Sequence, residues 1–364
     1  MAKHTFWSRL KRVFLKTHRH RTQGFTLLEL LVVTAIAGGI VAGLTFIVVQ
    51  IMTADQREAS RSETQREMQM ALDYISAELR EAIYVYPGEY LACSGNPGGS
   101  CKPFSDFLPN AVKTNSVPVL AFWKLQPFPA KIKNDCAAAE QKDVACLAGQ
   151  SYALVVYSLT KNEPGDARWK GKARITRYVL SQFDSNGNPN TGYVDPGLNR
   201  NLTSWPYKGD TNLQAGTPTG TADTLVDFVA FDFADATLSA DLKQAGFCPN
   251  LPDPTGTTTP IDEYSISPPD SLLKGEFAGI RTFYACVAAP LTEVETGAGA
   301  GTRIADQSAY RDTILYLTGN ASGRPGIAPD RNGLNLRGRN QDILPTLQTR
   351  ILSRSVLGRR PNDE

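Results

Sequence analysis

The first 86 residues form three segments that differ in polarity. Residues 1–24 are polar and basic. Residues 25–52 (FTLLELLVVTAIAGGIVAGLTFIVVQIM) are apolar apart from one ionisable side chain, Glu29. Residues 53–86 are rich in charge, but apolar side chains recur in them at helical spacing: Met68, Leu72, Ile75, Leu79 and Ile83.

This pattern predicts one long helix from about residue 25 to residue 85. About 20 apolar residues are enough for a helix to cross a bilayer, so residues 25–52 are predicted to span a membrane. Residues 53–86 are predicted to be the amphipathic half of the same helix, which docks on a β domain and ends at Pro87-Gly88. We expect the acids of this half on its solvated face: Glu63, Glu67, Glu78 and Glu81.

The rest of the chain has a strand pattern. Runs rich in Val, Ile, Tyr and Phe are bounded by Gly, Pro, Asn and Asp, at 117–123, 151–159, 173–183, 225–233, 280–288 and 311–318. Helices and strands do not alternate, which favours an antiparallel sheet over a parallel one. The predicted fold is α+β, a long helix packed on an antiparallel β-rich domain, with long loops at 88–116, 124–150, 184–224 and 246–275. A last strand or short amphipathic segment is expected within 343–357.

The predicted organisation is therefore a basic leader, a helix in two parts, and a β-rich head. The head is expected to occupy residues 87–358, followed by a disordered tail at 359–364.

Charge is unevenly distributed along the chain. The net charge is +2, and residues 1–24 carry seven Lys/Arg and no acid. Without them, 31 Lys/Arg face 36 Asp/Glu, so the remainder is mildly acidic and has no clustered basic footprint for nucleic acid. The positive-inside rule places residues 1–24 in the cytoplasm and the head outside it.

Other membrane-targeting segments fit less well. A secretory signal peptide has a shorter apolar core and a small-residue exit site, which are not found here. A plain signal anchor does not need an acid, and a charged side chain within a membrane helix costs about 2.5–3.5 kcal/mol by insertion scales. Glu29 therefore calls for a partner or a role.

The segment Gly24-Phe25-Thr26-Leu27-Leu28-Glu29-Leu30 resembles the class III signal of type IV prepilins and type II secretion pseudopilins. The resemblance implies that a prepilin peptidase cuts between Gly24 and Phe25 and that Phe25 is N-methylated. It also implies that the apolar helix is retained for assembly, with Thr26 and Glu29 as assembly residues. In such proteins the Glu pairs with the N-terminal amine of a neighbouring subunit or of its own. The leader is longer than most in this family.

Three glycines, Gly38, Gly39 and Gly43, lie in the middle of the apolar run. Two interpretations stay open for them: local extension of the helix in a filament, as in related filaments, and small-residue packing against other membrane helices. The run lacks the proline that many major pilins carry, which favours a minor subunit.

A closer resemblance concerns residues 62–69, 71–75 and 79–82 (SETQREMQ, ALDYI, LREA). They are similar to the pseudopilins of the hormogonium polysaccharide secretion system of filamentous cyanobacteria, and the order of elements resembles the larger minor pseudopilins of the J or W type. This implies a minor pseudopilin of a type IV pilus-like or type II secretion-like apparatus for polysaccharide export and gliding motility.

The implied partners are other major and minor pseudopilins, the prepilin peptidase, the inner-membrane platform and the membrane. The implied location is the inner membrane, as a single-pass protein with a periplasmic head, and then a pilus or pseudopilus. Alternatives are a minor pilin or tip adhesin of a motility pilus, and a pseudopilin of general type II protein secretion.

Six cysteines lie beyond the apolar run, and none forms a C-x-x-C pair. An even number outside the cytoplasm favours disulfides. The simplest of the fifteen possible connectivities pairs cysteines that are neighbours in the sequence: Cys93–Cys101, Cys136–Cys146 and Cys248–Cys286. The alternative is six reduced thiols.

The body of the chain offers little catalytic chemistry. All three histidines precede Gly24, and G-x-S-x-G, Walker A and H-E-x-x-H patterns are absent. We therefore expect no enzymatic activity and no cofactor. The alternative is an enzyme tethered by a pilin-like anchor.

One loop resembles a calcium-binding loop, with Asp184, Asn186, Asn188 and Asp195 as the oxygen ligands. It departs from the EF-hand pattern because Pro189 replaces the required Gly and Asp195 replaces the bidentate Glu. A plain hairpin turn is the main alternative, since Asn, Gly, Asp and Pro are also common turn residues.

Overall fold

The computed structural model describes residues 24–93, 102–138, 146–198, 202, 205–231, 247–249, 264–288, 291–294, 302–305, 312–327 and 344–353. The chain divides into two compact units, Met1–Asp55 and Gln56–Glu364. The long helix α2, Leu27–Arg80, contributes to both.

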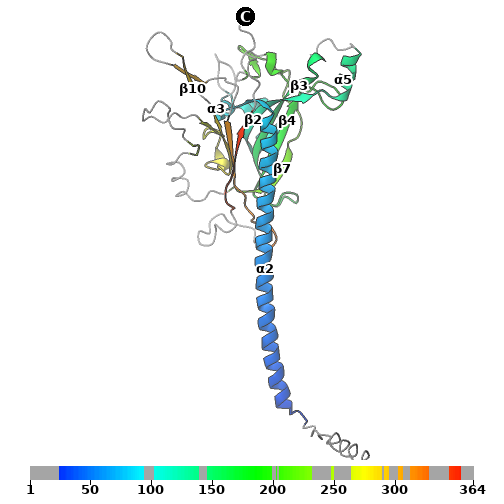
Figure 1. The fold of residues 1–364 in the computed structure, drawn as a ribbon, viewed down its shortest axis with the longest axis vertical. Helices are drawn as coiled ribbons and strands as arrows, with labels where there is room; N and C mark the ends of the chain where they lie inside the picture. The colour runs from blue at the N-terminus through cyan, green and yellow to red at the C-terminus, as the bar shows by residue number, and fades with distance from the viewer. Residues whose placement is uncertain are drawn as a thin grey trace, which may run out of the picture. The chain divides into compact units, whose positions relative to one another are not determined.

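In the first unit the described side chains of α2 are exposed. The most apolar 18-residue stretch of the helix has a mean hydropathy of 2.4, so by length and composition α2 qualifies to cross a membrane. In the second unit α2 buries one stripe, which begins at Ser60 and ends at Leu79. Figure 1 shows this part of α2 lying along the strands β2, β4 and β7.

Helix α2 ends at Arg80, five residues before the expected end. Strand β1, Ala82–Val85, follows at once and pairs antiparallel with β2. Ile83 continues the helical spacing of the apolar stripe, but the sequence Ala-Ile-Tyr-Val also suits a pleated edge strand. Pairing with β2 therefore decides the conformation of this segment.

The main sheet has five antiparallel strands in the order β1-β2-β3-β4-β7. The strands after β1 are β2 Ser116–Pro127, β3 Gln150–Lys161, β4 Ala173–Ser181 and β7 Asp223–Val229. A second antiparallel sheet has the order β13-β12-β9-β8. Its strands are β8 Tyr264–Ser267, β9 Phe283–Ala288, β12 Asp312–Leu317 and β13 Leu347–Leu352.

Smaller elements connect these strands. Two short hairpins pair β5 Tyr207–Lys208 with β6 Thr211–Asn212, and β10 Leu291–Val294 with β11 Thr302–Ala305. The short helices are α3 Gly88–Ala92, η1 Phe104–Phe107, α4 Asn110–Lys113, α5 Ala130–Ala137, η2 Cys146–Ala148, η3 Pro196–Leu198 and η5 Gly275–Phe277.

The α+β prediction is confirmed: a long N-terminal apolar helix is followed by antiparallel sheets. Each of the six expected strands overlaps a strand of the structure, and β13 lies in the segment expected to hold the last strand. The short strand β8 was not expected.

Both faces of the main sheet are covered. Residues of α2, one face of β2, β3 and β4, and residues of β9 and β12 form one apolar core. The opposite face forms a second core rich in aromatic rings, which includes Trp123, Phe104 and Trp205. Phe122 and Trp123 are neighbours in β2, yet they enter different cores because side chains alternate along a strand.

Polar atoms of the aromatic core are paired within it. The Trp123 indole donates to the Tyr86 hydroxyl at 2.9 Å, and that hydroxyl donates to the Leu202 carbonyl oxygen at 2.9 Å. The Trp205 indole donates to the Val194 carbonyl oxygen at 3.0 Å. Buried Trp and Tyr side chains therefore have the partners that they need.

Two of the three expected disulfides are present among the described residues, Cys136–Cys146 and Cys248–Cys286. The first links α5 to η2, and the second ties Cys248 to β9. Cys93 is also disulfide-bonded, but Cys101 lies outside the described residues, so the Cys93–Cys101 pairing stays a prediction.

The apolar stripe of α2 generates a stability prediction. Leu72 is 1% exposed, whereas Met70, two residues away on the same helix, is 51% exposed. Leu72→Ala should lower the free energy of unfolding by about 2–5 kcal/mol because it leaves a cavity in the core. Met70→Ala, the matched control, should change it by less than about 0.5 kcal/mol.

The free energy of unfolding is measured by urea titration of the full chain in detergent. The signal is tryptophan fluorescence, which reports on the buried Trp123 and Trp205. Equal losses for the two variants would show that α2 does not pack as described.

Candidate functional site

The predicted processing site lies just before the first turn of α2. Gly24 and Phe25 precede the helix, and the side chain of Phe25 is 77% exposed. A Cβ added at Gly24 would meet no atom within 4 Å. The predicted cleavage point thus lies outside the helix, next to an exposed Phe25.

Thr26 caps the helix. Its side-chain oxygen accepts a hydrogen bond from the backbone N–H of Glu29 at 3.3 Å, and its carbonyl oxygen accepts one from Leu30 at 3.1 Å. Thr-x-x-Glu is the spacing of a capping box, in which Ser or Thr satisfies a free N–H of the first turn. Thr26 therefore fixes where α2 begins.

Glu29 lies in this first turn and is exposed. A carboxylate here is favoured by the positive end of the helix dipole. Its side chain makes no ion pair within the part of the chain that the structure describes. A carboxylate in an apolar setting calls for a counter-charge, and the described residues do not supply an ion pair to Glu29.

The three mid-helix glycines lie in an unbroken helix. A Cβ added at Gly38, Gly39 or Gly43 would meet no atom within 4 Å. Both interpretations given above therefore stay open.

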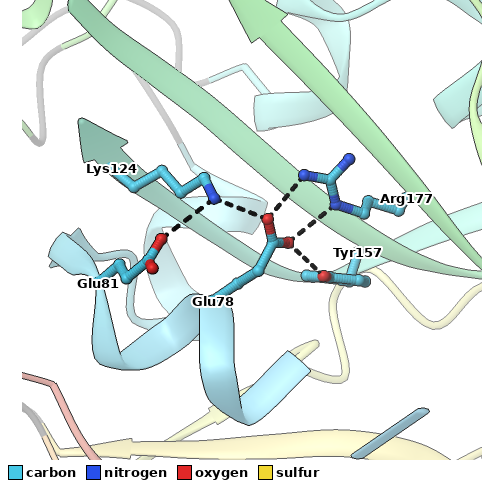
Figure 2. A network of polar contacts seen from close by, with 5 residues as sticks. All are labelled: Glu78, Glu81, Lys124, Tyr157 and Arg177. Carbon is cyan, nitrogen blue, oxygen red and sulfur yellow. Dashed lines mark hydrogen bonds and ion pairs between the residues drawn. The ribbon is translucent and has the colours of Figure 1, made fainter. Parts of the chain in front are cut away.

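The structure shows a second polar site on α2, in the β-rich unit (Figure 2). Glu78 is 7% exposed and faces the main sheet. Arg177 of β4 holds its carboxylate with two bonds, Nε to Oε2 at 2.8 Å and a terminal nitrogen to Oε1 at 2.7 Å. Lys124 of β2 donates to Oε1 at 2.8 Å, and the Tyr157 hydroxyl of β3 donates to Oε2 at 2.5 Å.

Each oxygen of Glu78 thus accepts two hydrogen bonds, which is the full capacity of a carboxylate. The three donors come from three adjacent strands, and Tyr157 and Arg177 are direct cross-strand partners. Lys124 also reaches Glu81 at 3.4 Å, so two bases and two acids balance in charge. We call Glu78, Lys124, Tyr157 and Arg177 the helix anchor.

The anchor shifts the acidity of its members. Burial by itself raises the pKa of Glu78, but the hydrogen bonds from Arg177, Lys124 and Tyr157 outweigh it and hold the pKa at about 2, against an ordinary 4.5. Burial and the bond to Glu78 raise the pKa of the Tyr157 phenol well above its usual range. At neutral pH, Glu78 is therefore ionised and Tyr157 is protonated.

The expectation that Glu78 lies on a solvated face is wrong. It lies three residues after Ile75, a spacing that places the two side chains on the same face of a helix. This spacing was the feature of the sequence that could have placed Glu78 on the buried face. Glu81 does lie at the surface, with a side chain that is 66% exposed.

The calcium-like loop closes on itself. The Asp184 carboxylate accepts from the backbone N–H groups of Asn186 and Asn188, both at 2.8 Å, and these bonds contribute to a lowered pKa. Asp195 accepts instead from the backbone of Gly197 at 2.7 Å. Among the described residues, no group of three or more His, Cys, Asp or Glu side chains is arranged to hold a metal. Calcium binding stays a prediction.

Comparison with known proteins gives one family match. Residues 19–45 match the prokaryotic N-terminal methylation motif. No curated protein and no solved structure matches the chain. The chain therefore carries a type IV pilin-like prepilin signal on an α+β fold of pilin-like architecture.

The helix anchor generates a pH prediction. The pKa of Glu78 is lower in the folded protein than its ordinary value, so the carboxylate stabilises the fold above about pH 5 and this contribution is lost as the pH falls towards 2. Glu78→Gln should lower the free energy of unfolding by about 2–4 kcal/mol at pH 7, and should flatten its dependence on pH below 5.

Glu81→Gln is the matched control, because it removes an exposed acid that touches the same lysine; it should cost less than about 1 kcal/mol. Unfolding of the full chain is followed by tryptophan fluorescence between pH 7 and 2. A wild-type-like pH profile for Glu78→Gln would contradict the assignment.

Proposed function

We propose that this protein is a minor pseudopilin, a structural subunit of a type IV pilus-like or type II secretion-like assembly. The observation that carries the proposal is the methylation motif at residues 19–45, at the start of a helix long and apolar enough to cross a membrane. The motif favours a structural subunit over an enzyme.

In this proposal the basic leader stays in the cytoplasm and α2 anchors the protein as a single-pass inner-membrane protein with a periplasmic head. The prepilin peptidase cuts between Gly24 and Phe25 and methylates the new amine. The subunit then joins other major and minor pseudopilins on the inner-membrane platform. Glu29, whose side chain makes no ion pair among the described residues, supplies the acid that pairs with a Phe25 amine.

The exported substrate in this proposal is a polysaccharide, and the associated behaviour is gliding motility. Support comes from the similarity of residues 62–82 to hormogonium polysaccharide pseudopilins, together with the J/W-like order of a long helix followed by a large β-rich domain. In a deletion strain, loss of surface polysaccharide supports this substrate. Loss of secreted proteins alone would favour general type II secretion instead.

Processing generates the first prediction of this proposal. Mass spectrometry of the membrane-derived protein should find an N-terminus at N-methylated Phe25. Gly24→Asp should leave the precursor uncut, because a side chain would enter the peptidase cleft. Gly43→Ala is the control and should be processed normally, since Gly43 lies within α2, far along the chain from the bond that is cut. Intact Met1 in assembled material would contradict the proposal.

The second prediction of this proposal concerns assembly. If Glu29 pairs with the amine of a neighbour, Glu29→Val leaves that amine unpaired in an apolar setting, where an unpaired charge is costly. We expect normal cleavage and membrane insertion, but reduced cross-linking to partner pseudopilins and reduced export.

Glu58→Gln, which removes an exposed acid further along α2, should assemble normally. If Glu29→Val cross-links and exports at wild-type levels, Glu29 is not an assembly contact.

A further inference from the structure

Residues 319–327 cross α2 at the start of the β-rich unit. The Ser60 hydroxyl of α2 donates to the Pro325 carbonyl oxygen at 2.8 Å. Gly319 lies against Thr64 and Met68, since a Cβ there would come within 3.4 Å of Thr64 and 3.2 Å of Met68. We call residues 319–327 the clasp.

Arg324 is the centre of the clasp. Its guanidinium contacts two acids one turn apart on α2, Glu63 at 3.1 Å and Glu67. The same group lies 4.1 Å from the ring centroid of Phe228, at the end of β7. The Arg324 side chain is only 8% exposed. A planar guanidinium is suited to such a fork between two carboxylates and an aromatic face.

The clasp approaches the helix very closely. A Cβ at Gly326 would lie 2.9 Å from the Gln56 Cβ and 3.0 Å from the Arg57 nitrogen, and Gly326 has φ +76°. Only glycine suits such a position. The other side of the clasp is tied to β7, where Asn320 donates from its backbone to the Phe228 carbonyl oxygen at 2.8 Å.

The helix turns beneath the clasp are held differently from the rest. Within residues 56–67 the only buried side chains are the polar Ser60 and Thr64. The apolar stripe begins at Met68 and continues to Leu79. Residues 56–67 therefore gain little from the hydrophobic effect, and their attachment depends on the polar contacts of the clasp.

The acids of the two ionic attachments differ in their access to water, although the bases do not: Arg324 is 8% exposed, against 16% for Lys124 and 20% for Arg177. The side chains of Glu63 and Glu67 are 64% and 33% exposed, whereas that of Glu78 is 9% exposed. Dissolved ions screen exposed pairs much more than buried ones. Added salt should therefore weaken the clasp while leaving the helix anchor intact.

We propose that the clasp is a salt-sensitive latch. It opens to release residues 56–67 of α2 from the β sheets while residues 68–80 stay docked. The latch thus sets the point along α2 at which the helix becomes free of the sheets. Its use during assembly, to let the helix adjust to neighbouring subunits, rests on the proposed function; the opening itself does not.

The test measures how often a buried thiol becomes reachable in the full chain, in detergent and without reductant. Thr64→Cys reports on the clasped turns, because Thr64 is 0% exposed. Ser76→Cys, at a position that is 4% exposed, reports on the docked turns. Labelling by a maleimide is timed for each reporter, alone and combined with Arg324→Ala, Arg324→Lys or Arg350→Ala. The last is the control, because the exposed side chain of Arg350 makes an ion pair with Asp312 on β12.

We expect Arg324→Ala to raise the labelling rate of Thr64→Cys by about tenfold, since contacts to charged groups are lost. Arg324→Lys should raise it less, and Arg350→Ala not at all. Raising the salt from about 0.02 M to about 0.5 M should have the same effect on Thr64→Cys, but no further effect once Arg324 is replaced. Ser76→Cys should not respond to any of these changes.

An unchanged Thr64→Cys rate would overturn the latch, and so would an equal rise at Ser76→Cys, which would indicate unfolding of the whole head. If Arg324→Ala does not fold, the salt series on Thr64→Cys alone decides. Because labelling needs no filament, a negative result here is distinct from a failure of the proposed function.

Discussion

The arrangement of the β-rich unit depends on a buried carboxylate that must be satisfied. Removing Glu78 from water is costly, and the cost is offset only if charged donors surround it with good geometry. Lys124, Tyr157 and Arg177 supply those donors from three neighbouring strands. A slide of α2 by one turn, or a rotation about its axis, would leave an acid and its donors unpaired. The anchor and the apolar stripe therefore favour the same axial and rotational register of the helix.

Helix α2 covers one face of the main sheet, and the long insertions cover the opposite face. Residues of the segments 88–116 and 184–224 supply much of the aromatic core, including Phe104, Val112 and Trp205. Strands β2 and β3 consequently read as nearly continuous apolar runs, because both of their faces are covered. These two insertions are part of the packed fold. Their length is therefore explained by packing and does not by itself indicate a ligand-binding surface.

The sequence predicted those elements whose local pattern is long and strong. These are the continuous apolar run, the helical spacing of the α2 stripe, and the six runs rich in β-branched and aromatic residues. It failed where a distant contact decides the outcome. The partners of Glu78 lie 46, 79 and 99 residues away in the chain, so the acid looks like any other on a charged helix. Strand β8, only four residues long, is defined by pairing with β9 and by a bond of 2.5 Å from Ser267 to the Val119 carbonyl oxygen.

The charges of α2 fall into three settings, and each implies a different kind of partner. Glu29 lies in an apolar run, and its side chain makes no ion pair among the described residues. Glu63 and Glu67 contact water themselves but share one buried arginine, and the exposure of the two acids favours a reversible attachment. Glu78 is buried, and both of its carboxylate oxygens are fully hydrogen-bonded within the fold. The attachment of α2 to the sheets therefore grows stronger along the helix, from the partly exposed ion pairs near residues 63–67 to the fully hydrogen-bonded carboxylate at Glu78.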